Sequence, residues 1–269
     1  MPEPGHPGFG GDDGRARMTG PDAILLALGA GLVGGAMNAL AGGGTFATLP
    51  ALIAIGLPAN AANATSNVAL LPGAATSAWA FRDEIAPIDG ISPWLLGGIT
   101  FAGALVGSVL LVVTPGSAFD IIIPWLLLFA SLVLAFGRRA AGWLHDRVTI
   151  GPRTLIVAQG VLGIYGGYFG GGMGLVTTAL YGLFAGIEPR GMFAQRTLML
   201  AIANFAAALV FVATGLIDWR AGLPMLAGSI VGGWAGAHIG KRLPAGGVRA
   251  WTLIVSIATT FVFFWRAYG

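Results

Sequence analysis

Long apolar stretches without any charged residue dominate the chain. Asp, Glu, Lys and Arg are absent between Asp22 and Arg82, and again over 90–119, 154–187, 197–217, 221–240 and 250–265. Most of these runs are as long as the roughly 20 apolar residues that cross a hydrocarbon core of about 30 Å. They predict eight apolar helical segments, at about 23–41, 45–57 with 62–81, 92–113, 119–137, 154–169, 173–185 with 192–214, 221–240 and 248–266.

These segments are continuously apolar and do not alternate apolar with polar residues, which favours helices over the strands of a membrane barrel. Two of the eight are interrupted by glycine, proline or polar residues. The sequence leaves open whether an interrupted unit crosses the membrane once or dips into it and returns. The pattern predicts an all-α, polytopic integral membrane protein.

Composition supports this class. Of the 269 residues 56% are hydrophobic and only 9% are charged, whereas a soluble domain carries about 25% charged residues. The chain has no cysteine, which excludes disulfides, thiolate metal sites and cysteine nucleophiles. The net charge of +3 is better explained by basic loops beside membrane helices than by nucleic-acid binding. We expect no metal, no cofactor and no nucleic-acid partner; the lipid bilayer is the expected surroundings.

The chain divides into two halves around its most polar internal stretch, which carries Arg138, Arg139, Arg147 and Arg153. The positive-inside rule predicts that this stretch is cytoplasmic. The expected organisation is a disordered tail over 1–21, a first transmembrane repeat over 22–137, a basic connecting loop over 138–153 and a second transmembrane repeat over 154–269.

An internal repeat relates the two halves. The run from Gly35 to the triple glycine Gly42–Gly44 matches the run from Gly163 to Gly170–Gly172, at an offset of 128 positions. Further matches follow in the same order, with Gly103, Gly107 and Pro115 against Gly232, Gly236 and Pro244. Two such halves are a recurring transporter architecture, with the substrate held at their interface. Parallel and inverted orientations both stay open, because the number of crossings per half is undetermined.

The triple glycines mark the candidate site. Gly42, Gly43, Gly44, Gly170, Gly171 and Gly172 each belong to a break between a helix and a shorter apolar piece of roughly 13 residues, too short to span about 30 Å. Polar backbone breaks inside lipid are tolerated where they are buried in protein or line a cavity. We expect helices starting at Thr65 and Thr197 to aim their N-termini at a central anion site; the alternative is that these residues only cap and pack helices. The substrate-binding candidates are Asn38, Asn63, Thr65, Ser66, Asn67, Gln195, Arg196, Thr197 and Asn204.

Arg196 is the full cation closest to either break. A guanidinium can bind an oxyanion through two parallel hydrogen bonds. The alternative is an interfacial arginine near Arg190 whose long stem reaches the headgroups. Its counterpart in the first repeat is Ala64, so the repeat itself does not demand a cation there.

Two other functional classes compete with a transporter of anions. An intramembrane enzyme needs a nucleophile with a base at membrane depth, and His238 is the only histidine placed to serve. We expect no catalytic residue. A cation channel or cation-specific transporter places acidic residues inside the bundle, whereas here they sit at segment edges.

The paired arrangement resembles the TauE/SafE family of sulfite and organosulfonate exporters. The residues that carry the resemblance are the Gly-rich first helix, Gly42–Gly44, Gly56-Leu57-Pro58 and Ala64-Thr65-Ser66-Asn67, with a second copy at 170–220. The second copy departs from the pattern at Leu198, where the family often has serine. The resemblance implies a multi-pass transporter of the bacterial inner membrane for sulfur oxyanions, such as sulfite or an organosulfonate, or related small organic anions, with export as the expected direction. From the interrupted segments we expect the anion to bind between the two repeats near mid-membrane.

Overall fold

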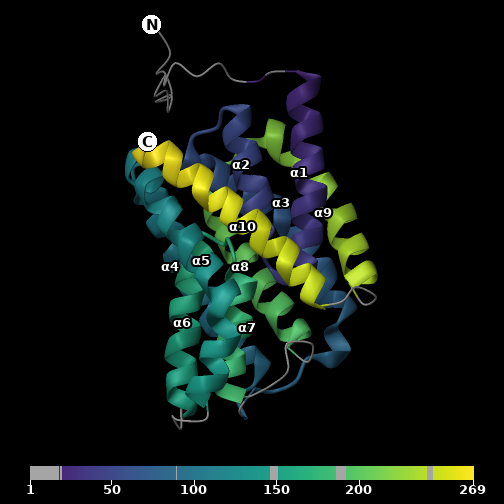
Figure 1. The fold of residues 1–269 in the computed structure, drawn as a ribbon, viewed down its shortest axis with the longest axis vertical. Helices are drawn as coiled ribbons and strands as arrows, with labels where there is room; N and C mark the ends of the chain where they lie inside the picture. Colours follow the sequence, from purple (N-terminus) through teal and green to yellow (C-terminus); the bar gives the residue numbers. More distant parts are fainter. Residues whose placement is uncertain (1–17, 19, 89, 146–150, 186–191, 241–244) are drawn as a thin grey trace, which may run out of the picture.

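The computed structural model describes residues 18, 20–88, 90–145, 151–185, 192–240 and 245–269 (Figure 1). Over this part of the chain it is an all-α structure of ten α-helices and one short 3₁₀ helix, which confirms the predicted class. The first half contributes α1 (Pro21–Ala41), α2 (Thr45–Ile55), α3 (Ala59–Ala80), the 3₁₀ helix Arg82–Glu84, α4 (Pro93–Val113) and α5 (Gly116–His145). The second half contributes α6 (Pro152–Tyr168), α7 (Met173–Ala185), α8 (Phe193–Ala213), α9 (Trp219–Gly240) and α10 (Ala245–Tyr268).

Some predicted boundaries differ. The unit predicted as 45–57 with 62–81 is two separate helices, α2 and α3, divided by a left-handed residue at Gly56 and by Pro58. Helix α5 continues to His145 and so enters the segment expected to be a connecting loop. The predicted tail at 1–17, part of that loop at 146–150 and Arg190 lie outside the described residues.

Helices α1 and α2 form a hairpin that returns to the end from which it started. The backbone N–H of Met18, ahead of α1, donates to the carbonyl of Ile55, the last residue of α2, at 2.9 Å. Both ends of the hairpin therefore lie together. The interrupted unit predicted as 45–57 with 62–81 therefore does not cross once: α2 leads to this end of the molecule, and α3 begins there and leads away from it.

The two halves run in opposite directions (Figure 1). We call the end where α1, α3 and α5 begin the N-terminal face; it is uppermost in Figure 1 and also holds the end of α10, where Arg266 pairs with Asp120 at 3.6 Å. The opposite end, where α4, α6 and α8 begin, we call the basic face. Because the first half starts at one face and the second half at the other, the repeats are inverted.

Equivalent glycines make equivalent contacts in the two halves. A Cβ on Gly232 of α9 would collide with the Leu32 carbonyl of α1, and a Cβ on Gly103 of α4 would come within 2.6 Å of the Gly160 carbonyl of α6. Leu32 and Gly160 are 128 positions apart, and Gly103 and Gly232 are 129 apart. The next turn repeats the correspondence, with Gly236 against Ala36 and Gly107 against Ile164. The contact between α1 and α9 is thus repeated, at equivalent positions of the predicted repeat, between α6 and α4.

A contact between equivalent residues marks the pseudo-two-fold axis. The hydroxyls of Ser131 on α5 and Thr260 on α10 lie 3.2 Å apart, and these positions differ by the repeat offset of 129. Only residues beside a two-fold axis can meet their own counterparts. The axis therefore passes between α5 and α10.

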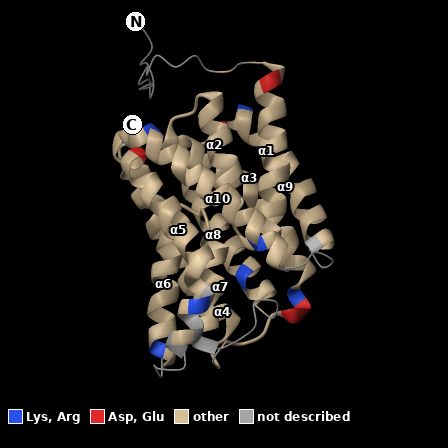
Figure 2. Ribbon diagram, in the orientation of Figure 1, with Lys and Arg blue, Asp and Glu red and all other residues tan. Residues whose placement is uncertain are grey.

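More basic residues lie in the lower half of Figure 2 than near the N-terminal face, where Arg220 begins α9 and Arg266 ends α10. Arg82, Arg139, Arg153 and Arg249 stand at the end of α3, the end of α5, the start of α6 and the start of α10, all at the basic face. Among the described residues, five helices are long and apolar enough to cross a membrane, and large aliphatic and aromatic side chains cover much of the exterior. The chain is a multi-pass membrane protein, and the positive-inside rule orients the basic face toward the cytoplasm.

The hairpin and the face assignment predict a labelling pattern. Because the chain has no natural cysteine, single substitutions at the exposed residues Asp22, Pro58 and Glu84 report sidedness directly. We expect an impermeant maleimide to label Asp22→Cys and Pro58→Cys from the same side of a sealed membrane and Glu84→Cys only from the other. Permeabilised membranes, in which all three should react, are the control. Labelling of Pro58→Cys from the side opposite Asp22→Cys would contradict the hairpin.

Candidate functional site

The last turn of α1 accepts hydrogen bonds from the first residue of the break, Gly42. Gly42 adopts a left-handed conformation, with φ of 81°, and its N–H donates to the carbonyls of Asn38 and Met37. The Asn38 side chain reaches across the break, where its Oδ1 accepts from the N–H of Gly44 at 3.2 Å. That bond fixes which end of the amide is the oxygen. The Asn38 Nδ2, fully buried, has no hydrogen-bond partner.

Arg196 extends from α8 to this same turn. Its Nη2 donates to the carbonyl of Ala39 at 3.0 Å and to that of Leu40 at 3.4 Å. The residue is only 6% exposed, and its guanidinium lies over the ring of Phe193, 4.4 Å from the centroid. The interfacial interpretation of Arg196 is therefore wrong, because the side chain points into the protein.

The charge on Arg196 is met by carbonyl dipoles. Within the described chain, no carboxylate lies within ion-pair distance of it, and its Nε has no partner. The last carbonyls of a helix carry the negative end of the macrodipole, equivalent to roughly half an elementary charge. Arg196 thus caps the C-terminus of α1 while keeping one donor unused.

The second break is capped in the same way by the other repeat. From α3, the amide of Asn63 donates to the carbonyl of Tyr168 at 3.0 Å, and that of Asn67 donates to Phe169 at 3.4 Å. Gly170 is left-handed, with φ of 71°, and a Cβ there would collide with the Asn67 Oδ1. Only glycine suits both the conformation and the contact. The C-terminus of α6 is therefore held by neutral amides, where α1 is held by a cation.

The two breaks touch each other. A Cβ on Gly42 would come within 2.6 Å of the Gly174 Cα, in the first turn of α7. The stem of Arg196 packs on the same Gly174, whose Cβ would lie 3.3 Å from the arginine Cδ. The two glycine breaks are therefore in contact, and the Arg196 side chain touches both of them.

The remaining candidate residues are spread along the repeat interface. The Ser66 hydroxyl lies 2.5 Å from that of Thr48 on α2. Thr65 accepts the N–H of Asp218 at 3.0 Å, near the start of α9. Gln195 donates to the Ala86 carbonyl beside the basic face, and Thr197 donates to Phe193 in its own helix. Asn204 is buried on α8. The structure therefore brings Asn38 and Arg196 to one break and Asn63 and Asn67 to the other, but leaves Thr65 and Gln195 away from both.

One expectation about the helix ends is wrong. Helices α3 and α8 begin at Ala59 and Phe193, so Thr65 and Thr197 lie inside helices and offer no free N-terminal donors. The signal was Pro58, which cannot continue α2 beyond its C-cap Gly56 and stands immediately before α3. The helices that begin at the breaks are α2, at Thr45, and α7, at Met173.

Unpartnered polar atoms concentrate on the predicted set. The buried side-chain atoms of the described chain that lack a partner are Asn38 Nδ2, Asn63 Oδ1, Gln195 Oε1, Arg196 Nε and Asn204 Oδ1. A buried polar atom without a hydrogen bond costs about 1–3 kcal/mol, and such atoms mark places where a ligand or water completes the bonding. Two of the five, on Asn38 and Arg196, are donors that belong to one helix turn and its cap. Sequence reasoning missed the carbonyls of Ala39 and Leu40 that anchor the Arg196 side chain through its Nη2, since backbone carbonyls leave no residue signature.

The contact between Gly170 and Asn67 predicts an asymmetry between two glycine substitutions. Gly170→Ala should lower the melting temperature in detergent more than Gly215→Ala, because both have φ near 70° but only Gly170 meets a neighbour. Gly215 has open space around its missing Cβ and so isolates the backbone strain. Adding Asn67→Ala to Gly170→Ala should recover part of the loss. Equal losses in the two single variants would show that Asn67 does not hold this break.

Comparison with known proteins agrees with this architecture. A protein of Haemophilus influenzae named "Probable membrane transporter protein" is 28% identical over 90% of this chain and 94% of its own. "Probable membrane transporter protein ORF9" of a Sinorhizobium species is 29% identical over 85% of this chain and 87% of its own. "Probable membrane transporter protein YfcA" of Escherichia coli K12 is 28% identical over 79% of this chain and 77% of its own. No solved structure matches the chain. The model of the family "Sulfite exporter TauE/SafE" matches residues 27–263, and the chain belongs to that family.

Proposed function

We propose that this protein is a transporter of the bacterial inner membrane that exports a small sulfur-containing oxyanion, such as sulfite or an organosulfonate, held between the two inverted repeats. The family name and the transporter names of its bacterial relatives support transport. The single observation that supports an anionic substrate is Arg196, which is buried between the two breaks and whose Nε has no hydrogen-bond partner.

Charge balance is the physical reason. An ion pays a desolvation cost of several kcal/mol when it leaves water, and cations inside membrane proteins are paired or functional. The α1 carbonyls offset only part of the charge on Arg196. An oxyanion beside the Nε would supply the rest and would itself regain hydrogen bonds. Substrate and arginine would then lower each other's cost of burial.

Asn38 is the second ligand in this proposal. Its Nδ2 and the Arg196 Nε are both unpartnered donors, and both residues are anchored at the last turn of α1. Donors suit an oxyanion, whose oxygens accept. The other polar residues of the repeat interface line the path of the anion in this proposal: Asn63, Ser66, Asn67 and Asn204. The side chains of Thr65, Gln195 and Thr197 bond to the backbone of the protein and would position neighbouring helices.

The rival classes fit less well. Arg196 is the sole charged residue that is buried in the described chain; a cation pathway would instead place carboxylates there. Ser66 bonds to Thr48, and His238 is exposed at the end of α9, where its Nδ1 lies 2.8 Å from the Trp234 carbonyl. A serine nucleophile paired with that base is therefore not formed.

The test is anion binding to the purified protein, with sulfite, sulfoacetate and thiosulfate as probes. Hydrogen bonds to charged groups contribute about 1.5–3 kcal/mol each, so Arg196→Ala should weaken binding at least about tenfold. Arg196→Lys keeps the charge but loses the paired N–H donors of the guanidinium. Its affinity for the anion should therefore lie between that of the unsubstituted protein and that of Arg196→Ala. Asn38→Ala should weaken binding by a smaller factor, since it removes a neutral donor.

Arg249→Ala is the matched control. That guanidinium also donates to two backbone carbonyls, those of Leu134 at 3.2 Å and Ala135 at 2.7 Å, but these belong to the interior of α5 and not to a helix that ends at a break. Its loss should leave anion binding unchanged. If folded Arg196→Ala binds as tightly as the unsubstituted protein, Arg196 is a helix cap only. Liposome flux of Na⁺ and K⁺ in place of the anions would favour the cation class.

A further inference from the structure

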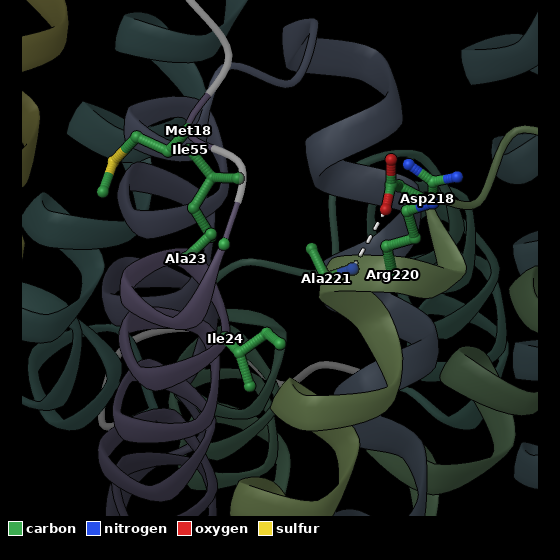
Figure 3. Close-up of a pocket in the computed structure, with 8 residues that line it drawn as sticks. Met18, Ala23, Ile24, Ile55, Asp218, Arg220 and Ala221 are labelled. Carbon is green, nitrogen blue, oxygen red and sulfur yellow. Dashed lines mark hydrogen bonds between the residues drawn. The ribbon is translucent and has the colours of Figure 1, made fainter.

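A cavity of about 340 Å³ lies at the N-terminal face, between the starts of α1 and α9 and the end of α2 (Figure 3). Figure 3 shows apolar side chains on one side of it and the polar pair Asp218 and Arg220 on the other. The cavity is lined by Met18, Gly20, Ala23, Ile24, Ile55, Asp218, Arg220 and Ala221. It is separate from the helix breaks described above.

The cavity arises where two tightly packed helices diverge. A Cβ on Gly31 of α1 would collide with the Met225 carbonyl of α9, and one on Gly228 with the Leu28 carbonyl. Toward the N-terminal face that contact ends, and Ala23 and Ala221 stand on opposite walls of the cavity. The bond from Met18 to Ile55 holds the chain ahead of α1 against the end of α2. The result is a wedge with an apolar interior.

The rim of the wedge lies at headgroup level. Trp219, 46% exposed, and Arg220, exposed, begin α9, and tryptophan and arginine at a helix end mark the membrane–water interface. Beyond the rim, Leu25 and Leu28 on α1 and Leu223 on α9 are exposed and apolar, as helices that face acyl chains are. The cavity is therefore placed where a lipid headgroup meets its chains.

The charges at the rim have a fixed arrangement. The Asp218 Oδ1 accepts the N–H of Ala221 at 3.0 Å, which caps α9 and fixes the carboxylate at the rim. Arg220 is in no ion pair within the described chain. A cation and an anion side by side complement a zwitterion better than a net anion, which the carboxylate would repel.

We propose that this wedge binds a membrane phospholipid with a zwitterionic, primary-ammonium headgroup. The phosphate lies on Arg220, the ammonium faces Asp218, and one acyl chain enters between α1 and α9. The position equivalent to Arg220 in the first repeat is Ile91, which is buried. The site therefore belongs to the N-terminal face alone, and it does not depend on which substrate the protein carries.

Native mass spectrometry of the purified protein tests this, with phosphatidylethanolamine, phosphatidylcholine and phosphatidylglycerol added one at a time. We expect phosphatidylethanolamine to bind most tightly and Arg220→Ala to weaken it about tenfold. Ile24→Trp, which fills the wedge, should remove binding whatever the charge at the rim. Arg266→Ala, a cation at the same face that is absent from the cavity lining, and Leu25→Trp, a bulky change on the exposed side of α1, are the matched controls.

Melting temperatures show which variants remain folded, and only folded variants are compared. Phosphatidylethanolamine binding that survives both Arg220→Ala and Ile24→Trp would overturn the site. If phosphatidylglycerol binds more tightly than phosphatidylethanolamine and Arg220→Ala removes that binding, the ligand is an anionic lipid. This result would contradict the proposed zwitterionic headgroup. Unchanged sulfite binding in Arg220→Ala is expected in either case, so this result stands apart from the transport proposal.

Discussion

Two helices end inside this protein, and the carbonyls they leave open are the constraint on which the central structure depends. In lipid there is no water to satisfy them, and each unsatisfied group costs several kcal/mol. Each set is satisfied by a helix of the other repeat, α8 for α1 and α3 for α6. Neither repeat can therefore complete its own break.

Glycine makes the exchange geometrically possible. Left-handed residues at Gly42 and Gly170 turn the chain out of each helix, and the missing side chains let the two turns approach. The same residue type then serves a second purpose along α1 with α9 and α4 with α6, where the backbones approach closely. Without a hydrophobic driving force between helices in lipid, such close packing supplies much of the association energy.

The repeat and the glycine breaks were predictable from sequence because small residues at fixed offsets record backbone contacts directly. Inversion was not, since hydropathy does not show whether an interrupted unit such as α2 with α3 continues in one direction or turns back. The helix starts were misplaced because polarity at Thr65 and Thr197 outweighed Pro58, a local signal with a clear steric basis. Arg196 was found as the cation nearest the breaks. Its partners, the carbonyls of Ala39 and Leu40, could be known only from the fold.

The two repeats differ in how their breaks are capped, since α1 is held by the charged Arg196 and α6 by neutral amides. A charge-assisted hydrogen bond contributes about 1.5–3 kcal/mol and a neutral one about 0.5–1.5 kcal/mol, so the α1–α2 hairpin is held more firmly than α6–α7. Inverted-repeat transporters alternate by exchanging the roles of their halves. Here the exchange is unequal, because Ala64 stands where the other repeat has Arg196. In the proposed binding mode the anion takes the Arg196 Nε, which the α1 carbonyls leave unused, so it adds to the firmer of the two caps and does not displace it.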